Sequence, residues 1–161
     1  MSREWPNNFS LAELIYSNTA KRKGIVNSPT QKQAERLREF AWQVLQPARD
    51  ALGRVRVDSG YRSPQLNIAL GGSERSDHMI RYKGESMTVA ADVRPIDVDL
   101  LMLFRWLWQH APWSRLIWEF GSWVHVSFGE DSKGRTPLRT GSGPKEAKYV
   151  ALAMRPEDFT G

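Results

Sequence analysis

The stretch Trp-Glu-Phe-Gly-Ser-Trp-Val-His-Val-Ser-Phe, residues 118–128, predicts a β-hairpin around which the rest of the chain is organised. In its second half the side chains alternate in character, as they do in a strand with one buried face. The face that packs in the core consists of Val124, Val126 and Phe128. The opposite face, which suits the wall of a cleft, carries Trp123, His125 and Ser127.

The length of the turn decides whether Glu119 joins His125. A two-residue loop, residues 121–122, puts the two side chains on opposite faces, because a shift of one residue in register reverses a side chain. A three-residue loop, residues 121–123, sets Glu119 directly opposite His125, about 5 Å apart at Cβ. We predict the three-residue loop or a bulged equivalent. The alternative for Glu119 is an ion pair with a surface arginine such as Arg115.

The composition is typical of one soluble globular domain. The 161 residues are 40% hydrophobic and 25% charged, enough for one sizeable core. The absence of cysteine excludes disulfides and thiolate zinc sites, so a metal needs histidine and carboxylate ligands. The net charge of +5 favours polyanionic surroundings. Residues 1–9 contain no signal-peptide core and no apolar run can span a bilayer, so we expect synthesis in the cytoplasm and no membrane insertion.

Two helices are predicted near the N-terminus. The first begins at a capping box opened by Ser10 and continues to about Ala20. The second begins after Ser28, which precedes a proline and has glutamine three positions on, and it continues to about Leu52. Pro47 should kink or interrupt this second helix near its end.

Two strands and a buried helix complete the expected core. Residues 54–59 and 89–94 each alternate as half-buried strands do, and Asp92 lies on the polar face of the second strand. Residues 98–109 follow Asp97, which can cap a helix, and are apolar on nearly every side. This third helix should therefore be buried against the sheet.

These elements predict an α+β fold in a single domain, residues 1–161. A small central antiparallel sheet is accompanied by the N-terminal helices and the buried helix. The core is expected over residues 9–128. A basic segment containing glycine and proline follows at residues 129–161, and residues 149–153 within it are either an edge strand or a terminal helix turn.

Two imidazoles and one carboxylate, each from a different element, form a donor set suited to Zn²⁺ with a fourth position for water: His78, Asp92 and His125. Zinc lowers the pKa of a bound water to about 7, and a nearby carboxylate such as Glu119 can take the proton. Arg62 can bind a substrate carboxylate or stabilise an oxyanion. Spacing alone leaves open that His125 is a core histidine and that Asp92 caps a strand.

Six short motifs follow one another along the chain: Ser-Gly-Tyr-Arg-Ser-Pro at 59–64, Leu-Asn at 66–67, Gly-Gly-Ser at 71–73, Ser-Asp-His at 76–78, Ala-Ala-Asp at 90–92 and Trp-Val-His-Val-Ser at 123–127. Together they resemble the M15 peptidase family, the zinc D-alanyl-D-alanine carboxypeptidases and cell-wall endopeptidases related to the Hedgehog signalling domain. The phage and bacterial branch is the most similar. The resemblance extends over residues 9–128 and implies a Hedgehog/DD-peptidase-like fold that holds one zinc ion.

The resemblance also implies roles for individual residues. The zinc ligands implied by the Ser-x-His, Ala-x-Asp and Trp-x-His motifs are His78, Asp92 and His125. The arginine of the Gly-Tyr-Arg-Ser turn, a catalytic group, matches Arg62. Residues expected to bind substrate or to support the ligands are Ser76, Tyr61 and Trp123.

This chain departs from the family pattern in two places. The usual pattern is His-x-x-Gly-x-Ala-x-Asp, whereas thirteen residues separate the first two ligands here and Thr88 replaces the glycine. We expect the insertion, residues 80–88, to be an exposed loop beside the cleft. Many relatives carry the acidic base three positions before the last histidine, where this chain has Ser122, so we assign the base to Glu119.

The favoured function is a zinc metallopeptidase, of D,D-carboxypeptidase or endopeptidase type, that cuts peptide bonds in the stem or cross-link of peptidoglycan. We expect a monomer with metal-activated water and Glu119 as general base. It would be a phage endolysin or virion-associated lysin, reaching the cell wall after release or as part of a virion. One alternative is a non-catalytic virion or wall-binding protein that keeps the fold. Nucleic-acid binding is disfavoured, because residues 105–115 are too apolar for an exposed groove and no binding motif is present.

Overall fold

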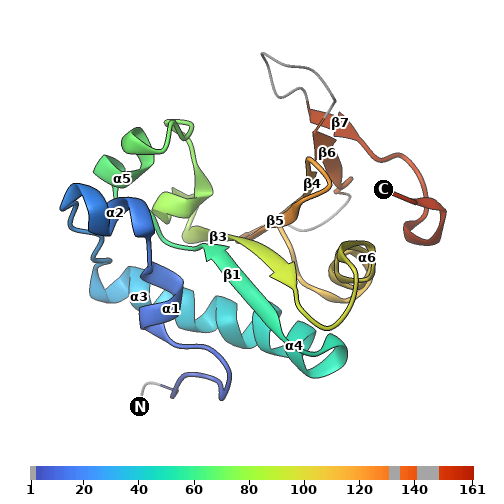
Figure 1. Cartoon of the computed structure of the whole chain (residues 1–161), viewed down its shortest axis with the longest axis horizontal. Helices are drawn as coiled ribbons and strands as arrows, with labels where there is room; N and C mark the ends of the chain where they lie inside the picture. Colours follow the sequence, from blue (N-terminus) through green and yellow to red (C-terminus); the bar gives the residue numbers. More distant parts are fainter. Residues whose placement is uncertain (1–2, 131–134, 141–148) are drawn as a thin grey trace.

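The computed structural model describes residues 3–130, 135–140 and 149–161 of the chain and confirms the α+β fold (Figure 1). The helices are α1 (Leu11–Ile15), α2 (Asn18–Lys23), α3 (Gln31–Phe40), α4 (Gln46–Leu52), α5 (Pro64–Ala69) and α6 (Leu100–His110). The strands are β1 (Val55–Ser59), β2 (Arg81–Lys83), β3 (Ser86–Pro95), β4 (Arg115–Glu119), β5 (Trp123–Phe128), β6 (Leu138–Thr140) and β7 (Tyr149–Ala151). No helix in the described ranges is long and apolar enough to cross a bilayer.

The central sheet has the strand order β1-β3-β5-β4-β6-β7, with β2 paired to β3 at one end. Its pairs are antiparallel with one exception, the parallel pair of β4 and β6, which departs from the antiparallel sheet that the sequence predicts. The reason is that β5 ends beside the start of β4, where Ser127 pairs with Arg115. A strand that enters the sheet from that end runs parallel to β4.

One face of the sheet packs in the core, as the alternation predicts. Its buried side chains from the central strands include Val89, Ala91, Val93, Val124 and Val126. The α3–α4 helix and α6 both lie against this face. In Figure 1 the α3–α4 helix is seen below β1 and β3, and α6 is seen to their right. Burial of these aliphatic groups removes apolar surface from water, which is the main favourable term in folding. The opposite face carries the polar side chains described below.

The first predicted helix is divided into two. Ser10 caps α1 as expected, since its hydroxyl accepts from the Glu13 backbone N–H. The backbone is extended at Tyr16 and Ser17, and Ser17 caps the separate helix α2. The Ser17 hydroxyl accepts a hydrogen bond from the Ala20 backbone N–H, three residues further along the chain. Such a local hydrogen bond competes with continuation of the preceding helix, and here it ends α1.

The second predicted helix starts two residues later than expected. Thr30, not Ser28, is the cap, and it forms a reciprocal capping box with Gln33. The helix then continues through a π-helical segment, Ala41–Leu45, into α4. Pro47 lies just after this segment, so the predicted interruption takes the form of a widened turn and not of a break.

The third predicted helix also starts two residues late. Asp99 caps α6 by accepting from the Met102 N–H at 2.8 Å. Asp97, the cap expected from the sequence, instead accepts from the backbone N–H and guanidinium of Arg54. The helix is buried on one side only, since Met102 is 50% exposed.

The insertion at residues 80–88 is a hairpin, so the expected exposed loop is wrong in part. Residues 81–83 pair with residues 86–88, and Gly84 occupies the turn with φ of 70°. The hairpin strand β2 is exposed, but both ends of the insertion are buried, with Ile80 at 1% and Thr88 at 4%. A two-residue turn that begins with glycine closes such hairpins well.

The last residues of the chain return to the core. β6 and β7 extend the sheet, so of the two alternatives left open for residues 149–153 the edge strand is the one that forms, over Tyr149–Ala151. Phe159 is 2% exposed and packs against Phe104 and Trp118, with ring centroids 5.1 and 5.3 Å away. The carbonyl of Phe159 accepts from the Arg105 guanidinium at 3.1 Å.

Candidate metal centre

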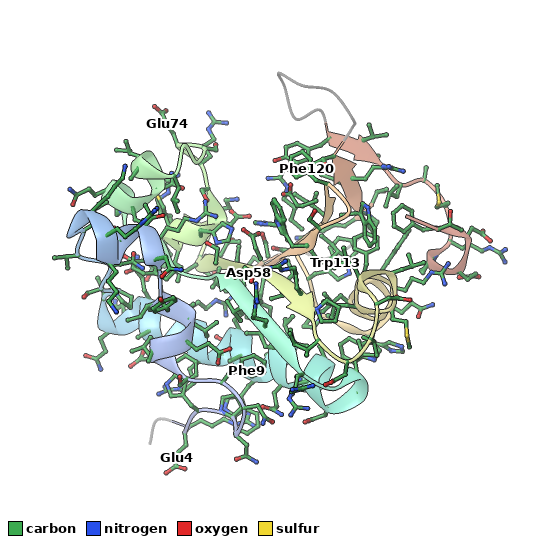
Figure 2. The ribbon with its side chains drawn as sticks, viewed as in Figure 1. Glu4, Phe9, Asp58, Glu74, Trp113 and Phe120 are labelled. Carbon is green, nitrogen blue, oxygen red and sulfur yellow. The ribbon has the colours of Figure 1, made fainter. Side chains whose placement is uncertain are left out.

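The polar face of the sheet forms the floor of a cleft of about 480 Å³. Asp92 of β3 pairs with His125 of β5, which pairs in turn with Ile117 of β4, so these three positions lie side by side. In Figure 2 Glu74 and Phe120 stand on opposite sides of this region. Ser73 and Arg75, the sequence neighbours of Glu74, line the cleft. Glu119, which precedes Phe120, and Trp123, which packs on it, also line the cleft.

His78 reaches the cleft from a short 3-10 turn, Asp77–Met79. Ser76 caps this turn by accepting from the His78 backbone N–H at 3.3 Å, and it lines the cleft as well. The His78 Nδ1 lies 2.8 Å from the carbonyl oxygen of Gly60. A carbonyl can only accept, so Nδ1 carries the proton and Nε2 keeps a lone pair. Nε2 lies 3.4 Å from Asp92 Oδ1.

His125 is held in the complementary way. Its Nε2 lies 2.9 Å from the hydroxyl of Ser127, and that hydroxyl donates its only proton to Asp77 Oδ2 at 2.7 Å. The hydroxyl therefore accepts from Nε2–H, which leaves a lone pair on Nδ1. Nδ1 lies 3.0 Å from the same Asp92 Oδ1.

Three acceptor atoms thus converge, all within 4.8 Å of one another, in residues that are 3% to 9% exposed. Two imidazole nitrogens can face one carboxylate oxygen at these distances only with a cation between them, either a proton or a metal ion. The donor set fits a divalent metal ion that prefers nitrogen and oxygen ligands. The sequence predicts this group of residues, and the fold brings them together.

Arg62 holds the other oxygen of Asp92. Its Nη2 donates to Asp92 Oδ2 at 3.3 Å and its Nε donates to the Ser59 hydroxyl at 3.0 Å. Burial by itself raises the pKa of the Asp92 carboxyl, but the neighbouring His78 and His125 outweigh burial and hold that pKa well below its usual range. The carboxylate is therefore ionised, with one oxygen for a metal and one for the guanidinium.

The hairpin register differs from the predicted one. The turn consists of residues 120–122 and not residues 121–123, so Ile117, and not Glu119, lies opposite His125. Glu119 pairs with Trp123. The shift is of an even number of residues, so Glu119 still shares the polar face with His125 as its diagonal neighbour, about 7–8 Å away and within reach of a long side chain.

The cause of this register lies in β6. The Phe120 N–H donates to the Thr140 hydroxyl at 2.7 Å, and Phe120 and Gly121 adopt φ of 54° and 66°. Phe120 is therefore the first residue of the turn, one position before the start that the sequence alone indicates. Thr140 is distant in sequence, and nothing in the hairpin itself reports its contact.

Glu119 lines the cleft in a partly buried setting. Burial raises the pKa of its carboxyl and the Asp92 carboxylate adds to the rise, while His125, Arg115 and Arg62 oppose it. In the described ranges no ion pair joins Glu119 to Arg115, whose guanidinium lies 5.0 Å from the centroid of the Tyr149 ring.

A family model described as Peptidase M15 matches residues 7–127. The chain belongs to the M15 peptidase family. The match contains all three converging residues, and it agrees with the resemblance seen over residues 9–128. No curated protein matched the chain. Membership of the M15 family identifies a metallopeptidase, and the buried His-Asp-His cluster is a site that could bind its metal.

Other residues singled out in the M15 motifs are placed differently from one another. Trp123 lines the cleft, half-buried, and packs on Phe120. Tyr61 lies in the core at 5% exposure, with its backbone N–H bonded to Leu14, and it is not among the residues that line the cleft. Ser122, where many M15 relatives carry an acid, is exposed in the turn.

Three residues that sequence reasoning gave no role surround the M15 site: Asp77, Lys83 and Ser127. Asp77 lies in the motif Ser-Asp-His and Ser127 alternates onto the same face as His125, so both had a signal in the sequence. Lys83 had none, because its position depends on the hairpin formed by the insertion. Its ammonium group pairs with Asp77 Oδ1.

Proposed function

We propose that the protein is a zinc-dependent peptidase that hydrolyses a peptide bond in the stem or cross-link of peptidoglycan. The observation that carries this proposal is the buried convergence of two imidazole lone pairs on one carboxylate oxygen, in a chain of the M15 family. Two imidazoles and a carboxylate are a common zinc donor set with a position left open.

Three atoms would hold the zinc ion: His78 Nε2, His125 Nδ1 and Asp92 Oδ1. When bound, zinc supplies a Lewis acid that polarises a carbonyl group and acidifies water. The ring orientations needed for this are fixed beforehand by the hydrogen bonds of the outer nitrogens, as is usual for ligating histidines.

Glu119 is the general base in this proposal. Its carboxylate accepts the proton of the attacking water and returns it to the leaving amine nitrogen. A pKa raised by burial suits both steps, because the group must hold the proton between them. Arg62, buried beside Asp92, keeps that carboxylate in place and offers positive charge near the developing oxyanion.

The cleft favours a substrate that carries carboxylates. Arg62, Arg75 and Arg115 all line it, and the whole chain has a net charge of +5. Guanidinium groups bind carboxylates with paired hydrogen bonds, and peptidoglycan stem peptides are rich in such groups. We propose action on the cell wall as a monomeric phage endolysin or virion-associated lysin, which the positive charge would draw to an anionic envelope.

Digestion of purified peptidoglycan tests the proposal. The protein should release new amino groups, lose this activity with a chelator and regain it with added zinc. His125→Ala should be inactive. His110→Ala is the matched control, since His110 lies exposed at the end of α6, and it should be fully active. Free D-alanine among the products indicates a carboxypeptidase, whereas separated stem peptides indicate an endopeptidase. No new amino groups at any zinc concentration would refute the function.

A second candidate function is a non-catalytic wall-binding or virion protein. It is favoured by Ser122, which is exposed in the turn where relatives carry the acid. Such a protein would sediment with peptidoglycan and bind zinc, yet release no new amino groups. The digestion above therefore separates the two.

A further inference from the structure

We propose that Lys83 positions the ligand His125 through Asp77 and Ser127, so that the hairpin insertion sets how tightly the centre holds its metal. This inference rests on the proposed metal centre but not on the identity of the substrate. Lys83, Asp77 and Ser127 lie outside the donor set, and none of them lies opposite Glu119 in the sheet.

The first contact orients the imidazole. His125 and Ser127 are two residues apart on β5, so both side chains point to the same face of the sheet. The Ser127 hydroxyl accepts from His125 Nε2 at 2.9 Å, which directs Nδ1 toward Asp92. Ser127 is fully buried, at 0% exposure, so water cannot replace it as the acceptor.

The second contact orients the hydroxyl. A serine hydroxyl can rotate and could equally donate to the imidazole, which would place the lone pair on the wrong nitrogen. Asp77 Oδ2, 2.7 Å from the Ser127 oxygen, accepts its proton and so excludes that arrangement. An ionised carboxylate has no proton to donate. The donor and acceptor roles in both hydrogen bonds of the Ser127 hydroxyl therefore depend on Asp77 staying in place and ionised.

The third contact keeps Asp77 in place. The Asp77 side chain is 5% exposed, and a buried carboxylate is costly without a partner. Its Oδ1 pairs with the Lys83 ammonium, while its Oδ2 is used by Ser127. Lys83 is the last residue of β2 and pairs with Ser86 across the turn, so the hairpin aims its side chain at the site. Without the insertion this cation has no strand to carry it.

The series Lys83–Asp77–Ser127–His125 therefore connects an exposed strand to a metal ligand. Partners of ligating histidines fix the tautomer and raise ligand basicity, and their loss typically lowers metal affinity by about 10–100-fold. We expect Ser127→Ala to fall in that range. Lys83 acts from further away and its side chain is 58% exposed, so Lys83→Met should weaken zinc binding less, by about 3–10-fold.

The test is zinc affinity, measured by competition with a chromophoric chelator. The variants are Ser127→Ala, Lys83→Met and Lys83→Arg. Arg81→Met is the matched control: it removes a cation from the same strand, but its guanidinium bonds to the Glu74 carbonyl and not to Asp77. Arg81→Met and Lys83→Arg should bind zinc as the wild type does. Urea unfolding of each metal-free variant shows whether the fold is retained.

The double variant Ser127→Ala with Lys83→Met decides between a connected series and a general effect of charge. If Lys83 acts through Ser127, the second substitution adds no further loss of affinity, because coupled residues are not additive. Additive losses, or an equal loss in Arg81→Met, would overturn the proposal. Unchanged affinity in every variant would overturn it too, while leaving the peptidase function untouched. Failure of peptidoglycan hydrolysis with the expected affinities would refute only the function.

Discussion

Glu119→Gln isolates the general base from the metal centre. Glu119 shares the polar face with His125 at the diagonal position, and its side chain lines the cleft. An amide keeps the shape of the carboxylate but cannot accept a proton. Loss of a well-placed general base typically costs about 10²- to 10⁴-fold in rate. At about 1.4 kcal/mol for each factor of ten, this corresponds to roughly 3–5 kcal/mol in the barrier.

The assay is the rate of release of new amino groups from peptidoglycan by zinc-loaded protein. Glu119→Gln should bind one zinc per chain and bind substrate normally, yet turn over at least about 10²-fold more slowly. Glu74→Gln, the same change on the opposite side of the cleft, should be as active as the wild type. Near-normal turnover of fully loaded Glu119→Gln would refute the assignment.

Three further predictions concern the surroundings of the site. Arg62→Ala should lower turnover by about 10²-fold in zinc-saturated protein, because it removes the positive charge near the developing oxyanion; wild-type turnover by the variant, with saturation verified by metal analysis, would contradict this. Phe159→Ala should lower the free energy of unfolding by about 3–5 kcal/mol in urea titrations, because it empties a buried aromatic site, and an effect under about 1 kcal/mol would show that the C-terminal residues are not part of the core. Asp97 has its pKa lowered from 3.8 to about 2 by the guanidinium and backbone N–H of Arg54, so its contribution to stability is complete above pH 4 and lost as pH falls through 2. The difference in urea midpoint between wild type and Asp97→Asn should follow that course, and a difference independent of pH would exclude it.

The parts of the fold that follow from local pattern could be predicted from the sequence. Alternation identified the strands at residues 54–59, 89–94 and 123–128 and the apolar face of each that packs in the hydrophobic core, because side chains in a strand alternate strictly. That same rule placed Asp92 and His125 on a polar face. Their pairing across β3 and β5 then follows once the strands are neighbours.

The parts that depend on distant contacts could not be predicted. The turn register is set by Thr140, which takes the N–H of Phe120. Helix starts were displaced by two residues where two capping side chains compete, and at α6 the choice fell to Asp99 because Arg54 engages Asp97. The hairpin in the insertion gives Lys83 a partner that no local pattern indicates.

Stepwise addition of zinc to metal-free protein, with peptidoglycan hydrolysis measured at each step, tests whether one bound zinc ion makes the protein a peptidase. The rate should rise in proportion to bound zinc and reach its maximum at one zinc per chain. His125→Ala should show neither tight binding nor hydrolysis. Full hydrolysis by metal-free protein, or saturation of the site with zinc and no hydrolysis, would contradict zinc-dependent catalysis at this site.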